Sequence, residues 1–235
     1  SFNSMVSHID QLIQRTYVAE LSEKDAKLAA LEAQLNPHFL YNTLQAVSTE
    51  ALINEQPQIH RMITALASNL RYTIKGDTLV PLKQEMIYVE DYIFLQKIRM
   101  DDALTFTSSI DPAAEECLIP KISIQTLVEN SIIHGKSGNT DRIHIDITAQ
   151  YNDTNVIITV RDNGCGISPE QLDKLYADFD LQKNTGKYGG IGLANLHSRI
   201  RLLYDKPASL DIHTQEKQYT EIVLTLPVTK GVPYV

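Results

Sequence analysis

Several features that mark other protein classes are scarce in or absent from this chain of 235 residues. No run approaches the roughly 18 apolar residues of a membrane-spanning helix, and no signal peptide is visible. The two cysteines, Cys117 and Cys165, are far apart without a CxxC spacing, so we expect reduced thiols rather than a metal site. Lysine and arginine are outnumbered by aspartate and glutamate, and the resulting net charge of −8 argues against direct binding of nucleic acid. These absences favour a globular signalling or metabolic protein.

The beginning of the chain also lacks an initiator methionine, and we therefore expect a fragment of a longer protein. Residues 2–53 contain no glycine and only one proline, Pro37, which predicts helix. A turn at 54–58 is followed by a second helical pattern that stops near Gly76, with Pro57 near its first turn. One helical hairpin buries little apolar surface, so this part predicts a dimeric four-helix bundle.

Within the first helical run, "LEAQLNPHFLYNTL" places His38 directly after Pro37. At about 100° per residue, one face of the following helix is apolar and the opposite face is polar. The apolar face holds Leu40, Leu44, Val47 and Ala51, and the polar face holds His38, Asn42, Gln45 and Thr49. An exposed neutral imidazole is a competent nucleophile near pH 7. The alternative is a helix start, with Asn36 as the cap, Pro37 at the first position and His38 incidental.

From about residue 79 the pattern changes to alternating helices and strands. Helices are predicted over 80–100, 121–135, 168–176 and 193–204, and strands over 103–110, 143–150, 155–162, 209–215 and 220–227. Ser168 and Pro169 form a typical start for the third of these helices. The two strands at 143–162 predict a hairpin. The fold class is α+β, with helices packed against a mixed sheet.

Two segments of this half carry side chains suited to a nucleotide. Asn130 and His134 lie four apart on a predicted helix, and a neutral amide oxygen suits Mg²⁺ that is bound to a nucleotide. "VRDNGCGI" places Asp162, Gly164 and Gly166 directly after a strand, where a carboxylate can accept a hydrogen bond from an exocyclic amine. Taken singly, each segment also fits a plain structural feature, namely a polar helix end or a strand-ending turn.

A third segment, "GKYGGIGLANLHSRI", is rich in glycine just before a helix. Its glycines are Gly186, Gly189, Gly190 and Gly192. Free N–H groups at a helix start favour an anion. No GxxxxGK[ST] loop occurs, and no strand feeds directly into this segment, so neither a Walker loop nor a dinucleotide fingerprint is predicted. Lys183 and Lys187 could add charge for phosphates or could be solvated loop residues.

The order of these three segments resembles, over about residues 118–227, the GHKL (Bergerat) ATP-binding domain of histidine kinases, gyrase-type ATPases, MutL-type proteins and heat-shock ninety chaperones. Residues 31–44 are similar to the phosphoacceptor box of YesM/LytS-type sensor histidine kinases. The resemblance implies residues 1–25 as the end of a HAMP segment, 26–78 as the dimerisation and phosphotransfer hairpin, and 79–235 as the ATP-binding domain.

The resemblance also implies roles for individual residues. His38 is the autophosphorylated residue, Asn42 orients its ring, and Asn130 is the Mg²⁺ ligand. Asp162 holds the adenine amine of ATP. The other implied nucleotide contacts are His134, Gly164, Gly166, Gly190, Gly192 and Thr220. Three positions depart from common family patterns: Phe39 stands where many kinases have an acidic residue, Ile133 where many have a basic one, and Tyr219 where a glycine is usual.

The implied function is that of a two-component sensor kinase that passes its phosphoryl group to the receiver domain of a response regulator. A homodimer is implied, as is a parent protein anchored in the plasma membrane through a segment absent from this chain, with this part in the cytoplasm. Three alternatives remain. One is a GHKL ATP-binding scaffold or phosphatase without autokinase activity. The second is a GHKL ATPase of the mismatch-repair or chaperone kind, and the third is a coiled-coil adaptor.

Overall fold

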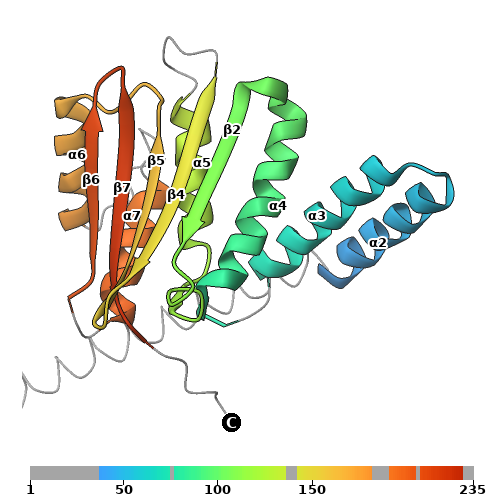
Figure 1. Ribbon diagram of the computed structural model, residues 1–235, viewed down its shortest axis with the longest axis horizontal. Coiled ribbons are helices and arrows are strands. Elements are labelled where there is room, and N and C mark those ends of the chain that lie inside the picture. Colours follow the sequence, from blue (N-terminus) through green and yellow to red (C-terminus); the bar gives the residue numbers. More distant parts are fainter. Residues whose placement is uncertain (1–36, 75–76, 136–141, 182–190, 205–206, 230–235) are drawn as a thin grey trace, which may run out of the picture. The chain divides into compact units, whose positions relative to one another are not determined.

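The computed structural model describes residues 37–74, 77–135, 142–181, 191–204 and 207–229 (Figure 1). The chain divides into two compact units, Ser1–Ala67 and Ser68–Val235. The predicted HAMP segment lies outside the described residues. So do Gly186, Gly189 and Gly190 of the glycine-rich segment, together with Lys183 and Lys187.

The first unit contains helix α2 (Pro37–Ile53) and most of helix α3 (Pro57–Ile74). The turn between them closes as the Gln56 N–H donates to the Ala51 carbonyl over 2.8 Å, with Glu55 at a positive φ of 55°. Pro57 is the first residue of α3, where its missing N–H leaves no helical hydrogen bond unmade. The predicted helical hairpin is therefore confirmed.

Small and polar residues fill the contact between α2 and α3. Ser48 is buried, and its Oγ lies 2.8 Å from Nδ1 of His60 and 3.0 Å from Oγ1 of Thr64. Of the apolar face expected on α2, Ala51 is buried, whereas Leu40 and Val47 are 38% and 48% exposed. The buried stripe is thus rotated toward Ser48, because hydrogen bonds to α3 compensate the burial of its hydroxyl. The more apolar neighbours are left on the outer side.

The second unit is built on a five-stranded mixed sheet in the order β2-β4-β5-β7-β6. The strands are β2 (Leu104–Ile110), β4 (Ile143–Tyr151), β5 (Asn155–Asp162), β6 (Ser209–Gln215) and β7 (Tyr219–Pro227). Only the β2–β4 pair is parallel among them. β4 and β5 form the predicted hairpin. Asn152 Oδ1 accepts the backbone N–H groups of Thr154 and Asn155 in its turn.

Helices α5, α6 and α7 lie on one face of this sheet, behind the strands in Figure 1. The helices of this unit are α4 (Leu82–Met100), α5 (Ser123–Gly135), α6 (Pro169–Leu181) and α7 (Ile191–Leu203), and Asp101–Ala103 form a short 3₁₀ turn. A small antiparallel pair, β1 (Leu79–Pro81) with β3 (Leu118–Pro120), was not predicted. The α+β architecture, with helices packed against a mixed sheet, is confirmed.

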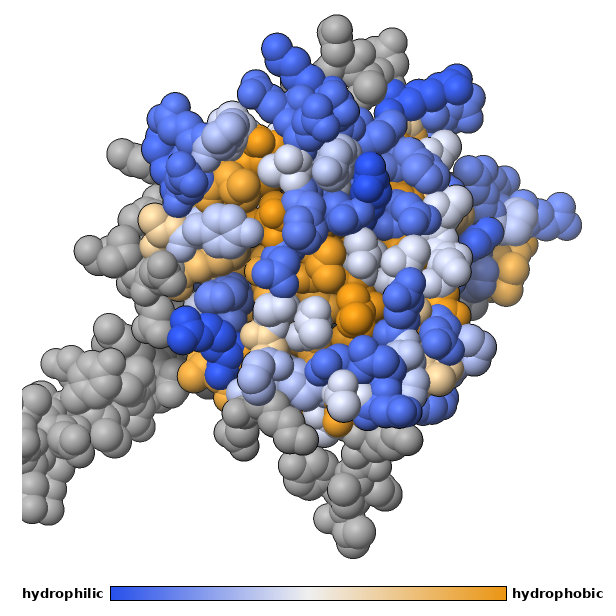
Figure 2. All heavy atoms as spheres, turned by 60° about the vertical axis from the view of Figure 1, so that its left-hand side comes forward, coloured by the Kyte–Doolittle hydropathy of each residue, from blue (hydrophilic) through white to orange (hydrophobic). Residues whose placement is uncertain are grey.

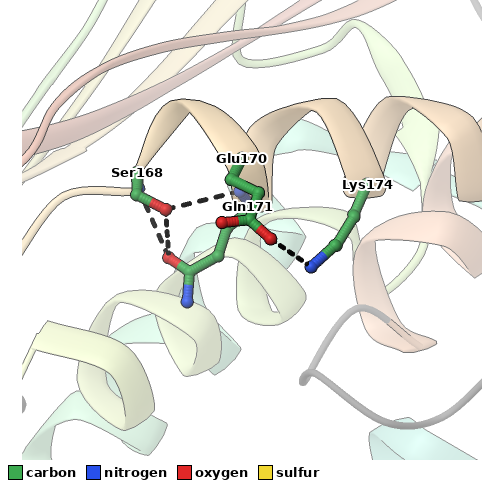
Figure 3. Close-up of polar contacts among 4 residues, drawn as sticks. All are labelled: Ser168, Glu170, Gln171 and Lys174. Atoms are coloured by element: carbon green, nitrogen blue, oxygen red, sulfur yellow. Dashed lines mark hydrogen bonds and ion pairs between the residues drawn. The ribbon is translucent and has the colours of Figure 1, made fainter.

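Helix α6 begins with a reciprocal pair of side-chain caps (Figure 3). Ser168 Oγ accepts the Gln171 N–H over 3.3 Å, and Gln171 Oε1 accepts the Ser168 N–H over 3.3 Å. This S-x-x-Q capping box satisfies two backbone donors that a helix start leaves unpaired. One turn on, Lys174 Nζ lies 2.8 Å from Glu170 Oε1 on the exposed face. The sequence prediction of Ser168 as the cap is confirmed.

Replacing Ser168 with alanine is expected to lower the free energy of unfolding by about 1 kcal/mol, because one helix donor loses its acceptor. For a domain of this size, that loss corresponds to a fall in Tm of about 2–4 °C by calorimetry. Lys174→Ala is the control, since exposed ion pairs contribute little. A Tm in Ser168→Ala equal to that of the control would contradict the assigned capping role.

The face of the molecule that Figure 2 shows is largely polar. On this face, hydrophilic residues surround scattered patches of hydrophobic ones. The exposed large apolar residues of the second unit are Ile74, Ile87, Ile98, Ile133, Tyr176 and Leu202. Among the described helices, none has the length and apolar character needed to cross a lipid bilayer.

Candidate functional site

The carboxylate of Asp162 is placed by the alternation of its strand. Along β5, Val156, Ile158 and Val160 are buried on the helix-facing side of the sheet, and Asp162 is the next residue in that series. Successive side chains of a strand point to opposite faces, so the same period of two carries this carboxylate inward. Asp162 is only 5% exposed. A carboxylate buried at the end of an apolar strand is costly unless it has partners.

Those partners come from α5 and from the turn that follows β5. Asp162 Oδ2 accepts the hydroxyl of Ser131 over 2.8 Å, and Oδ1 accepts the Gly164 N–H over 2.9 Å. Burial raises the pKa of Asp162 above its ordinary value, while hydrogen bonds from Ser131, Gly164 and Thr220 and the nearby His134 oppose this shift. Sequence reasoning missed Ser131, although its place beside Asn130 on the same helix was the available signal.

Two glycines after Asp162 occupy positions that no side chain could fill. A Cβ on Gly164 would lie 2.5 Å from Cα of Gly135, the last residue of α5. Gly166 has a φ of +63°, and a Cβ there would lie 2.2 Å from the carbonyl oxygen of Gln215. The chain therefore passes close to both α5 and the end of β6, and only glycine permits this approach.

Helix α5 brings Asn130 next to the start of α7. A Cβ on Gly192 would lie 3.2 Å from Cγ2 of Thr126 and 3.9 Å from Nδ2 of Asn130. Asn130 Nδ2 donates to the Thr126 carbonyl over 3.0 Å, and an amide that donates through its nitrogen keeps its oxygen as an acceptor or metal ligand. His134 is exposed at the C-terminal end of α5.

Thr220 lies directly opposite Asp162 in the register of β5 and β7. Paired residues of neighbouring strands share a face, so Thr220 belongs to the same side of the sheet as the carboxylate. Its neighbour Tyr219 points to the other side, where its ring centroid lies 4.2 Å from Cζ of Arg161. Alternation thus keeps the Tyr219 ring away from Asp162, although a glycine is usual at this position in the family that the sequence resembles.

Two further candidate residues belong to the first unit. His38 is exposed in the first turn of α2, and Nδ2 of Asn42 lies 3.2 Å from its Nδ1 and 3.5 Å from its Nε2. The four residues of the predicted polar face, His38, Asn42, Gln45 and Thr49, are all exposed. The structure therefore brings His38 and Asn42 together on the solvent side of the helix. Gly190, a predicted nucleotide contact, lies outside the described residues.

The second unit thus gathers Asn130, Asp162, Gly192 and Thr220 from four separate elements. This arrangement fits the parts of a nucleotide. The buried carboxylate suits the base, the adjacent backbone without side chains allows close contact, and the amide beside a helix start suits the phosphates. Among the described residues, no group of three or more His, Cys, Asp or Glu side chains is placed to hold a metal ion.

Comparison with protein families gives two matches to this chain. Residues 26–104 match the model described as histidine kinase. Residues 121–230 match the model described as histidine kinase-, DNA gyrase B- and HSP90-like ATPase. The second match contains every candidate residue of the second unit, and the first contains His38 and Asn42.

Similar proteins include two curated sensor kinases and a solved catalytic domain. Sensor histidine kinase YesM of Bacillus subtilis is 37% identical over 96% of this chain and 37% of its own length. Sensor histidine kinase YpdA of Escherichia coli is 36% identical over 88% of this chain and 35% of its own length. The nucleotide-free catalytic domain of histidine kinase ThkA has a TM-score of 0.49 at 16% identity, covering 67% of this chain and 100% of that one. This chain spans little more than a third of the curated relatives it matches.

Proposed function

The chain belongs to the family of sensor histidine kinases, and from this premise we propose that it transfers the γ-phosphoryl group of ATP to an imidazole nitrogen of His38. The observation that carries the proposal is the buried Asp162, held by Ser131 and Gly164 and paired with Thr220. Its carboxylate is suited to accept a hydrogen bond from the exocyclic amine of adenine. The backbone at Gly164 and Gly166 supplies the close approach that a flat base needs.

The phosphates would lie toward the start of α7, where Gly192 is the second residue of the helix. Gly190, just before the helix in the sequence, is a further candidate contact. Backbone N–H groups at a helix start favour anions. Asn130, beside Gly192, would supply a neutral oxygen to Mg²⁺, which takes most of its other ligands from phosphates and water. The bound Mg²⁺ would neutralise charge on the phosphates. His134, at the end of the same helix, is a further candidate contact.

At the acceptor, the lone pair of a neutral imidazole nitrogen attacks the γ-phosphorus while the bond from that phosphorus to the β,γ-bridging oxygen breaks. ADP leaves, and the proton on the other ring nitrogen is lost to water. Phosphoryl transfer depends mainly on in-line positioning and charge neutralisation, so an acidic residue beside the histidine is not required by the chemistry. Phe39 therefore does not conflict with the proposal. Asn42 orients the ring through its contact with Nδ1.

The wider assignment follows the family and is part of the same proposal. Residues 1–25 end a HAMP segment, 26–78 form the dimerisation and phosphotransfer hairpin, and 79–235 form the ATP-binding domain. Large apolar side chains remain exposed on the first unit, which supports a homodimeric four-helix bundle. They are Phe39, Leu40, Val47, Leu52, Ile53, Ile59 and Leu66. An aspartate of a response regulator would accept the phosphoryl group from His38, and a segment outside this chain would anchor the parent protein in the plasma membrane.

The direct test is incubation of the chain with γ-labelled ATP and Mg²⁺, followed by treatment with acid or base. Phosphohistidine is labile in acid and stable in base, so we expect label that acid removes and base retains. A scaffold or phosphatase would bind ATP without acquiring label. A GHKL ATPase would release phosphate steadily without a phosphoprotein, and a coiled-coil adaptor would show no stabilisation by ATP.

Asn130→Ala is expected to lower Mg²⁺-dependent labelling at least about tenfold, because the metal loses a ligand and the phosphates lose part of their charge neutralisation. The measurement is the initial rate of labelling across a range of Mg²⁺ concentrations. The oligomeric state and the nucleotide-free Tm should stay unchanged, since Asn130 is only half-buried and its side chain bonds within its own helix. Normal labelling in this variant would reject Asn130 as the metal ligand.

A further inference from the structure

A buried carboxylate outside the nucleotide site connects several elements of the second unit. Glu85, in the first turn of α4, has no exposed surface. Its Oε2 accepts a hydrogen bond from the hydroxyl of Tyr72. The same oxygen accepts the Ile122 N–H over 2.9 Å, and Oε1 accepts the Gln125 N–H over 3.4 Å. One carboxylate thus receives donors from α3 and from the first turn of α5.

The α3 side of this junction is built around the Tyr72 ring. Tyr72 is 4% exposed, and its ring stacks on that of Tyr88 with centroids 3.7 Å apart. Lys121 Nζ lies 4.9 Å from the Tyr72 centroid and 3.5 Å from the Thr73 carbonyl oxygen. The end of α3 from Ser68 onward belongs to the second unit, whereas the start of the same helix belongs to the first. Tyr72 therefore fixes the end of a helix that both units share.

The α5 side contains a backbone conformation that side chains rarely adopt. Ile122, immediately before α5, has a φ of +63°, and this left-handed region is especially unfavourable for a β-branched residue. Its N–H is held by Glu85, and its carbonyl accepts the N–H and the hydroxyl of Thr126. The residue that sets the start of α5 is thus kept in a strained conformation by the buried carboxylate. Asn130 lies two turns further along this helix.

Two basic side chains interact electrostatically with Glu85, Arg199 from α7 and Lys121 from the turn before α5. Burial lowers the pKa of the Arg199 guanidinium in α7, while its attraction to Glu85 opposes the shift. Burial likewise lowers the pKa of Lys121, while its attraction to Glu85 opposes the shift. Burial raises the pKa of Glu85 itself. Replacing buried charged groups with apolar residues is often neutral or stabilising, so stability alone does not account for this cluster.

We propose that Glu85 and Tyr72 are positioning residues that join the end of α3 to the start of α5, so that displacement of the hairpin's second helix is transmitted to the helix carrying Asn130. The inference rests on the proposed kinase function. The joint would allow the hairpin to control phosphoryl transfer without any contact of its own with the nucleotide. Tyr72 and Glu85 would touch neither ATP nor His38, and would act through the placement of α5.

The test is Tyr72→Phe in the full chain, which removes the hydroxyl but keeps the ring stack and the contact with Lys121. Tyr88→Phe is the matched control, because it removes a hydroxyl from the other ring of the same stack. We expect the labelling rate at saturating ATP to fall about tenfold in Tyr72→Phe, with the KM for ATP changed less than about twofold. Amide hydrogen exchange should quicken in both the last turn of α3 and the first turn of α5.

The proposed role of Tyr72 and Glu85 would be overturned if Tyr72→Phe left amide hydrogen exchange in the first turn of α5, or the labelling rate, unchanged. A rate, KM and Tm that all deteriorate together would indicate a merely structural role and would also overturn it. If the unmodified chain takes up no label, the kinase proposal fails, and hydrogen exchange still decides whether the joint exists. As a second variant, Glu85→Gln should quicken exchange at the start of α5 more than Tyr72→Phe does, since it weakens both sides of the junction.

Discussion

His38→Gln is expected to abolish incorporation of label from γ-labelled ATP, with at least about a thousandfold loss in rate. Glutamine keeps a polar side chain of similar reach, but the lone pair of its amide nitrogen is delocalised into the carbonyl group and does not attack phosphorus. His38 is exposed and contacts Asn42 alone in its hydrogen bonds among the described residues, so the change should leave the fold intact. Nucleotide affinity should be unchanged, because the proposed ATP contacts lie in the other unit.

The matched control for this variant is His213→Gln, which replaces an exposed histidine of β6. It should take up label at the normal rate, and the label should remain acid-labile and base-stable. Identification of the labelled peptide by mass would place the phosphoryl group within residues 37–53. Label that persists at full level in His38→Gln would contradict the assignment of His38 as the phosphoryl acceptor, even if ATP binding were intact.

Asp162→Asn is expected to weaken ATP binding about a hundredfold while leaving the nucleotide-free protein folded. The proposed adenine contact needs an acceptor, and the variant can present an amide N–H in its place. Ser131 can rotate its hydroxyl to accept from that amide, so the internal hydrogen bond need not be lost. Titration with a fluorescent ATP analogue measures the affinity, and Tm without nucleotide monitors the fold.

The same variant should not lower the nucleotide-free Tm at pH 7. Burial raises the pKa of Asp162 in the folded state, so the folded protein binds the proton more tightly than the unfolded chain does. The carboxyl group therefore favours folding at pH values below its unfolded pKa of about 4, and this contribution is lost as the pH rises through the raised pKa of the folded state. Asparagine carries no charge at any pH. The difference obtained by subtracting the Tm of the original protein from that of the variant should accordingly be largest near neutral pH. This difference should decline toward pH 4.

A nucleotide-free Tm several degrees below that of the original at pH 7 would show that Asp162 supports the fold rather than the ligand. Unchanged ATP affinity would remove the adenine contact from the proposal. Ser131→Ala is a useful companion, because it deletes one hydrogen bond that holds the carboxylate and leaves the acceptor in place. Its affinity should fall between those of the original and Asp162→Asn.

The elements of the second unit could be predicted because their sequence patterns are local. The alternation of Val156, Ile158 and Val160 predicts the strand, and in the structure the same alternation continues to the buried Asp162. Ser168 predicts the start of α6, since its partner Gln171 is only three residues away. The three-residue strands β1 and β3 escaped prediction because so short a segment carries no measurable period.

Contacts between distant segments could not be predicted in the same way. The polar face of α2 is exposed as expected, whereas the apolar face is covered by α3 only in part, since Ala51 is buried and Leu40 and Val47 are exposed in the single chain. Ser48 is buried there because His60 and Thr64 of the next helix satisfy its hydroxyl. The place of Ser131 beside Asn130 marked it as a possible site residue, but only the folded structure shows that its hydroxyl meets Asp162.

The sequence by itself determined the longer helices and strands, the alternation along β5 that ends at Asp162, and the four-residue spacing that sets Asn42 beside His38. These follow from backbone periods of 3.6 and 2 residues, which act over one or two turns. Only the tertiary structure decided that β2 pairs in parallel with β4, that Gly192 abuts Asn130, and that Glu85 is buried. The burial of Glu85 is tolerable only where donors from α3 and α5 converge, and such convergence exists only once the chain has folded.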